Sequence, residues 1–114
     1  MINTSLHLYK NNFKLQKKLK NINSKDFIIK VKSCGICGSD LKIIKNGSSR
    51  VAPGRVIGHE IAGEIYNLKK NKLINTGKKI LLGADIPNDK NNDYALGHEI
   101  DGGFQEYLIL NQNL

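Results

Sequence analysis

Short apolar runs separated by turn residues dominate the hydrophobic pattern of this chain. The runs are rich in β-branched and aromatic residues and are too short for typical helices, which favours strands. Asn, Gly and Pro pairs that favour turns recur between them. The pattern therefore predicts a mainly β chain, with strands at residues 27–32, 61–66, 79–82 and 104–110.

One segment departs from this pattern and predicts a helix. Residues 38–40 read Gly-Ser-Asp, a capping sequence, and apolar residues follow at 41, 43 and 44 with helical spacing. Asn46-Gly47 is a typical helix stop. We therefore expect a short helix directly after Cys37, and we expect the polar segment 85–93 to be a loop.

Size, charge and hydropathy narrow the function classes. The chain has 114 residues, which predicts a single domain over 1–114. Its formal net charge is +8, but lysines are spread along the chain and far outnumber arginines, so we expect solvated surface and no nucleic-acid partner. No apolar run is long enough for a bilayer and no leader pattern is visible, so we expect no membrane partner and a cytoplasmic location.

The two cysteines offer three interpretations. Cys34 and Cys37 lie three positions apart and cannot join distant segments as a disulfide. A redox Cys-x-x-Cys motif would need a βαβ context, and a zinc knuckle would need a second cysteine pair; the chain offers neither. The third interpretation is a site in which one cysteine binds a metal together with histidine or carboxylate ligands from elsewhere.

The sequence Gly-His-Glu-Ile occurs twice, at residues 58–61 and 97–100. The residues that flank the first copy have no counterpart around the second, so we do not interpret the pair as an internal repeat. Either histidine could be the metal ligand on residue type alone.

The order of the motifs carries a resemblance to a known family. Residues 31–41, VKSCGICGSDL, are followed by residues 53–65, PGRVIGHEIAGEI. This pair resembles the GroES-like N-terminal domain of the zinc-dependent medium-chain dehydrogenases, the alcohol, sorbitol and threonine dehydrogenase group. GGFQEY at 102–107 is similar to a further family strand, and the resemblance covers about residues 24–111. It implies a GroES-like distorted β-barrel with one or two short helices, incomplete relative to the family.

The resemblance also implies roles for individual residues. Cys37 and His59 match the ligands of the catalytic zinc, and Glu60 matches an adjacent glutamate that binds or approaches the metal. Ser39 matches the hydroxyl that relays the substrate proton, and Asp40 matches the carboxylate that orients the site. A thiolate and a neutral imidazole suit zinc, and a carboxylate behind the imidazole fixes its tautomer.

Two further residues receive different expectations. Cys34 aligns with a position that is not a ligand, so we expect a small core residue. His98 lies in the variable approach to the GGF strand, so we expect a loop histidine that makes surface hydrogen bonds. The other interpretation of His98 is that it completes a site with too few ligands.

Several family features are missing from the sequence. No G-x-G-x-x-G occurs, the structural-zinc cysteines are absent between residues 84 and 93, and Lys42 stands where many relatives have a relay histidine. We therefore expect a zinc-binding catalytic-domain fragment of an alcohol or polyol dehydrogenase. It would obtain NAD or NADP only through a missing domain or a nucleotide-binding partner chain. The alternative is a non-catalytic remnant or protein-interaction module that associates as a homo-oligomer or with another chain.

Overall fold

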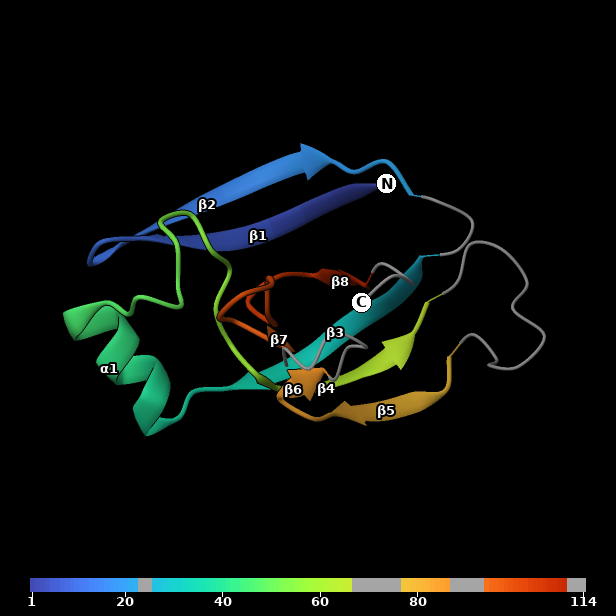
Figure 1. Cartoon of the computed structure of the whole chain (residues 1–114). Helices are drawn as coiled ribbons and strands as arrows, with labels where there is room; N and C mark the ends of the chain where they lie inside the picture. Colours follow the sequence, from blue (N-terminus) through green and yellow to red (C-terminus); the bar gives the residue numbers. More distant parts are fainter. Residues whose placement is uncertain (23–25, 67–76, 87–93, 111–114) are drawn as a thin grey trace.

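The computed structural model describes residues 1–22, 26–66, 77–86 and 94–110. In these ranges the chain forms strands and a single helix, arranged as in Figure 1. The elements, in chain order, are β1 (Ile2–Tyr9), β2 (Asn12–Leu19), β3 (Phe27–Gly35), α1 (Gly38–Asn46), β4 (Glu60–Ile65), β5 (Lys79–Leu82), β6 (Asp85–Ile86), β7 (Tyr94–Ala95) and β8 (Tyr107–Leu110).

The central sheet is antiparallel, with strand order β5-β4-β3-β8. Its inward face carries Ile29 and Ile61, which pack with Leu96 and Leu108 into one buried cluster. Side chains alternate between the two faces of a strand, so the same register turns Ala62 and Glu64 outward. Burial of each of these large aliphatic side chains contributes roughly 1.5–3 kcal/mol.

A register shift in β3 determines where this sheet meets the rest of the molecule. Between Val31 and Ser33 the pairing with β4 shifts by one residue, and it then continues to Gly35 opposite Glu60. A bulge of this kind bends the strand and increases its twist. The end of β3 and the start of β4 consequently lie side by side (Figure 1).

Helix α1 begins where β3 has ended, with Cys37 as its N-cap residue. The side chain of Asp40 accepts the backbone N–H of Cys37 at 3.0 Å, so the cap is one residue earlier than the Gly-Ser-Asp sequence predicts. The predicted stop is confirmed, since Gly47 takes a φ of 73° and donates its N–H to Ile43. Ile43 anchors the helix on a second buried cluster with Leu8 and Ile57.

The hairpin of β1 and β2 was not predicted from the sequence. Its turn lies at Lys10, whose φ of 44° is unusual for a residue other than glycine. Most β2 side chains are exposed, with Leu15 at 72% and Leu19 at 74%, so the lysine-rich strand has the pattern of solvated surface. Isolated bridges join β1 to Gln105 and to Arg55 and attach the hairpin to the rest of the fold.

The predicted mainly β fold with one short helix is confirmed. Three predicted strands correspond to β3, β4 and β5, whereas β8 begins at Tyr107 instead of residue 104. Residues 104–106 instead bridge β1 and β3, because Phe104 accepts from Leu6 and Glu106 accepts from Val31. In the described ranges the strands form three sheets that do not close into a barrel.

The predicted 85–93 loop is partly a strand pair. β6 and β7 bond to one another through Asp85 opposite Ala95 and Ile86 opposite Tyr94. Residues 87–93, which this prediction also covers, lie outside the described ranges. Within the described part of the chain, no helix has the length and apolar character needed to cross a membrane.

Gly63 in β4 gives a direct test of this packing. A Cβ at Gly63 would lie 2.6 Å from the carbonyl oxygen of Lys30 and 2.8 Å from Ile29, whereas a Cβ at Gly83 would meet nothing within 4 Å. We expect Gly63→Ala to lower the free energy of unfolding by about 1–3 kcal/mol, measured by urea denaturation. Gly83→Ala is the matched control and should change it little; equal effects would contradict this packing.

Candidate metal centre

The candidate centre lies where β3, α1 and β4 meet. Gly35 and Glu60 are the last paired residues of β3 and β4. Cys37 follows two residues after Gly35 as the helix cap, and His59 directly precedes β4. Strand register therefore brings together two side chains that are 22 positions apart in the sequence.

Three potential ligand groups converge at this point. The Sγ atom of Cys37 lies 3.3 Å from Nε2 of His59, and Oδ1 of Asp40 lies 3.5 Å from Nδ1 of the same ring. The ligand atoms of the three residues all fall within 4.8 Å of one another. His59 consequently has Cys37 at one ring nitrogen and Asp40 at the other.

Asp40 has a double function in this geometry. Its side chain is fully buried, and Oδ2 accepts the backbone N–H of Cys37 while Oδ1 faces His59. Oδ1 of Asp40 and Nδ1 of His59 are buried atoms without a hydrogen-bond partner, and they face one another. A small ring rotation that shortens their separation to about 2.9 Å would satisfy both atoms.

The donor set fits a zinc ion. A proton on Nδ1 of His59, directed at Asp40, leaves the Nε2 lone pair on the side of Cys37. Around a tetrahedral zinc, with Zn–S of about 2.3 Å and Zn–N of about 2.0 Å, sulfur and nitrogen ligands lie about 3.5 Å apart. The 3.3 Å observed between Sγ and Nε2 is close to that separation.

The other two predicted site residues lie beside this group. Ser39 is in the first turn of α1, and its Oγ is 2.8 Å from Sγ of Cys37. Glu60 is exposed at the start of β4 and is not part of the 4.8 Å group. Its carboxylate lies against Gly35, where an added Cβ would meet Oε2 at 2.6 Å. The structure thus brings Ser39 to the ligand group and leaves Glu60 outside it.

Cys34 is a partly buried member of the central core and packs against its buried cluster. Burial, and after it the negative charge of Asp40, raise the pKa of this thiol to about 11. The protonated thiol is therefore the stable form at neutral pH. This environment agrees with the expected packing role and differs from that of Cys37.

The second Gly-His-Glu-Ile copy lies close to the first. The ring centroids of His98 and His59 are 6.0 Å apart, and Nδ1 of His98 lies 3.3 Å from the carbonyl oxygen of Leu96. The expected hydrogen bond is present, but the position beside His59 was not predicted. The signal in the sequence was the repeated motif itself, which could not show that the copies meet in space.

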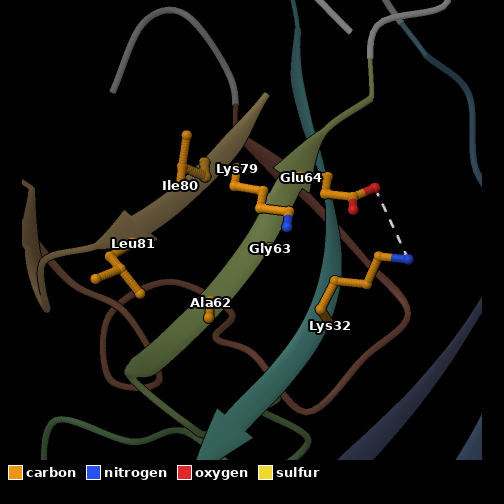
Figure 2. A pocket seen from close by; sticks show the side chains of 7 residues that line it. All are labelled: Lys32, Ala62, Gly63, Glu64, Lys79, Ile80 and Leu81. Atoms are coloured by element: carbon orange, nitrogen blue, oxygen red, sulfur yellow. Dashed lines mark ion pairs between the residues drawn. The ribbon is translucent and has the colours of Figure 1, made fainter. Parts of the chain in front are cut away.

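A pocket of about 720 Å³ lies elsewhere, on the outward face of the central sheet (Figure 2). Residues from β3, β4 and β5 form its walls, and Lys32 and Glu64 make an ion pair of 3.8 Å beside it. None of the candidate metal ligands lines it. The pocket is therefore separate from the candidate centre.

Comparison with known proteins places the chain in a family. The model of the alcohol dehydrogenase GroES-like domain matches residues 23–114. The chain belongs to this family. The match includes every residue of the candidate centre.

Curated relatives are dehydrogenases of greater length. The GroES-like chain is 28% identical over 110 residues to L-threonine 3-dehydrogenase of Caldanaerobacter subterraneus, covering 82% of the chain and 32% of the relative. It is 35% identical over 97 residues to L-galactonate-5-dehydrogenase of Escherichia coli, covering 71% of the chain and 28% of the relative. The chain thus spans about a third of the length of these relatives.

Solved structures show the same fold. A protein from Sinorhizobium meliloti 1021, described as a zinc-binding dehydrogenase and bound to NADP, superposes with a TM-score of 0.78 at 24% identity. The superposition covers 98% of this chain and 37% of that one. It includes β1 and β2, which precede the residues matched by the family model.

The raised pKa of Cys34 can be measured in a Cys37→Ala variant, which retains a single thiol. The folded-state pKa of about 11 lies above the ordinary thiol pKa of 9.0, so the neutral thiol stabilises the fold below pH 9. This stabilisation should be lost as pH rises from 9 through 11. We expect ultraviolet thiolate absorbance to reach half its maximum near pH 11 in the folded variant and near 9 in urea. Coinciding midpoints would contradict the buried environment.

Proposed function

We propose that this chain is a zinc-binding catalytic domain of an alcohol or polyol dehydrogenase, with Cys37 and His59 as metal ligands. The observation that carries the proposal is the 3.3 Å approach of the Cys37 sulfur to Nε2 of His59, with buried Asp40 behind the other ring nitrogen. A ligand histidine that donates its second N–H to a carboxylate is the usual arrangement in zinc sites.

Each side chain has a distinct task in this proposal. Zinc, when bound, supplies a Lewis acid that stabilises the negative charge on a substrate alcohol oxygen. Asp40 holds the His59 ring in its tautomer and orientation, and its bond to the Cys37 N–H fixes the sulfur at the helix start. Ser39, whose hydroxyl lies 2.8 Å from that sulfur, would relay the substrate hydroxyl proton, with its Oγ accepting that proton while its own proton passes on toward water. Glu60 corresponds to the glutamate that binds or approaches the metal, although its exposed carboxylate lies outside the convergent group here.

Hydride transfer also requires a dinucleotide held against the substrate carbon. The sequence contains no G-x-G-x-x-G, and the chain covers 32% of a threonine dehydrogenase relative. We propose that a nucleotide-binding domain or partner chain supplies NAD or NADP, and that the substrate is a small alcohol or polyol. The NADP-bound neighbour, of which this chain matches 37%, supports this arrangement.

The remnant or interaction-module alternative has less support. Burying a carboxylate and an imidazole that face one another costs desolvation free energy. A chain without a metal site would gain little from keeping such a buried pair. The exposed leucines of β2 are consistent with a contact surface, but lysines on an edge strand are also a common means of preventing association.

Native mass spectrometry of the purified chain tests the metal site. We expect one bound zinc, retained in Cys34→Ala and His7→Ala and lost in Cys37→Ala and His59→Ala. The control residues are matched by type, since Cys34 packs in the core and His7 bonds to Ser5 and to Gly54. Absence of zinc from the folded parent chain would contradict the proposal.

An Asp40→Asn variant isolates the contribution of the carboxylate charge. Asparagine has nearly the same shape and can still accept the Cys37 N–H, but it attracts the N–H of His59 less strongly. We expect zinc affinity, measured by chelator competition, to fall by about 10–100-fold. Circular dichroism of the metal-free protein would confirm an intact fold, and unchanged affinity would show that Asp40 acts only as a helix cap.

A further inference from the structure

The β1–β2 hairpin concentrates the positive charge of the chain. Residues 1–20 contain no aspartate and no glutamate. Their basic side chains are Lys10, Lys14, Lys17, Lys18 and Lys20, so the segment supplies +5 of the formal net charge of +8. None of the ion pairs in the described ranges involves one of these lysines. The positive charge of the hairpin is therefore offset neither by its own sequence nor by an ion pair across the fold.

A nearby carboxylate lies on the other side of β1. Glu106 accepts the backbone N–H of Thr4 at 3.1 Å and donates its own N–H to the carbonyl oxygen of Thr4. These bonds use the edge of β1 that faces away from β2. The lysines of β2 consequently stand on the outer side of the hairpin, away from Glu106.

The same hairpin exposes aliphatic side chains on one face. Residues directly opposite one another in an antiparallel pair project from the same face. Leu19 lies opposite Ile2, and this pair shares a face with Leu15 and its partner Leu6. Ile2, Leu15 and Leu19 are 61%, 72% and 74% exposed. Lys17 stands between the two leucines on this face, which we call the hairpin face.

No described segment covers the hairpin face. In the described ranges β2 pairs with β1 alone, and β1 is joined to the rest of the fold through Arg55 and residues 104–106. Figure 1 shows β2 on the outer side of β1, away from the central sheet. The face is therefore an apolar surface bordered by lysines and open to a partner.

The chemistry of the hairpin discriminates among partners. A second copy of the chain would bring two lysine-rich, acid-free hairpins together, and like charges would repel. Nucleic acid is bound through arginine forks and stacked aromatic rings, whereas residues 1–20 contain no arginine and the most exposed apolar side chains of the hairpin are aliphatic. Protein interfaces are depleted in lysine. Each of these partners therefore matches only part of the surface.

An anionic lipid surface matches both of its properties. Clustered lysines are attracted to negatively charged headgroups, while aliphatic side chains enter the boundary between headgroups and acyl chains. Lysine stems can also lie along apolar surface and keep their ammonium groups at the headgroup level. We propose that the hairpin face is a peripheral binding site for an anionic bilayer surface.

This inference is independent of the proposed zinc site and goes beyond it. We expected no membrane partner because no apolar run can span a bilayer. A contact with the bilayer surface needs no such run, because the apolar side chains penetrate only the outer part of one leaflet.

Sedimentation of the full chain with lipid vesicles tests the inference. We expect binding to vesicles of equal parts phosphatidylcholine and phosphatidylglycerol, and none to phosphatidylcholine alone. Binding should weaken as salt is raised, because ions screen the lysine–headgroup attraction. Failure to bind the mixed vesicles at low salt would overturn the inference, and so would equal binding to both kinds of vesicle.

A triple substitution locates the charge. It replaces lysine by glutamine at residues 14, 17 and 18 of β2, where all three lysines are exposed. We expect an affinity loss of about 100-fold, since each lysine near an anionic surface contributes about fivefold. The control replaces the exposed lysines at 30, 45 and 78, outside the hairpin, and should lose less than about fivefold. Equal losses would assign the attraction to net charge and overturn the hairpin site.

A double substitution separates a lipid surface from other polyanions. Leu15→Ala with Leu19→Ala should weaken binding to the mixed vesicles by at least about tenfold, because fewer methylene groups enter the lipid. The control, Leu41→Ala with Leu81→Ala, removes two other exposed leucines and should match the parent. Unchanged binding by the first pair would indicate a purely electrostatic contact, of the kind made with nucleic acid or an acidic protein, and would overturn the lipid assignment. Circular dichroism checks that each variant remains folded.

Discussion

The pairing of β3 with β4 is the constraint on which the candidate centre depends. Gly35 opposite Glu60 is the final pair of that ladder, and Cys37 and His59 stand just beyond this pair, Cys37 after β3 and His59 before β4. The register shift after Val31 sets this end point. Because side-chain direction alternates along a strand, a slip by one residue would turn Ile61 out of the core and displace His59 from Cys37. The hydrophobic core and the metal centre thus require the same register.

Close glycine contacts provide a second level of organisation. Gly58 takes a φ of 100°, and an added Cβ would meet both Cys34 and the Phe104 ring at 2.7 Å. The conformation and the space both exclude a larger residue. His59 is consequently held by a backbone that is packed from two sides, by Cys34 from β3 and by the segment that contains Gly102.

Much of the central sheet could be predicted from alternation and turn chemistry, because its strands have one apolar face and clear flanking signals. The β1–β2 hairpin could not, since its turn lacks glycine and β2 buries little. The motif order placed Cys37, Asp40 and His59 together, although their chemical roles remain predictions. The position of His98 depends on backbone contacts between segments 39 residues apart, and periodicity carries no information about such contacts.

The attachment of β1 has a consequence for how the fold is reached. Asn3 is buried and bonds through its side chain to Gln105 and to the backbone of Tyr107, across more than a hundred positions. Contacts of such sequence separation close large loops and slow the search for the native state. On a ribosome, β1 emerges long before Gln105 and Tyr107 do. Asn3 therefore lacks these two partners until Tyr107 has left the exit tunnel. The segment that carries His98 can settle against His59 only in the same late phase of synthesis.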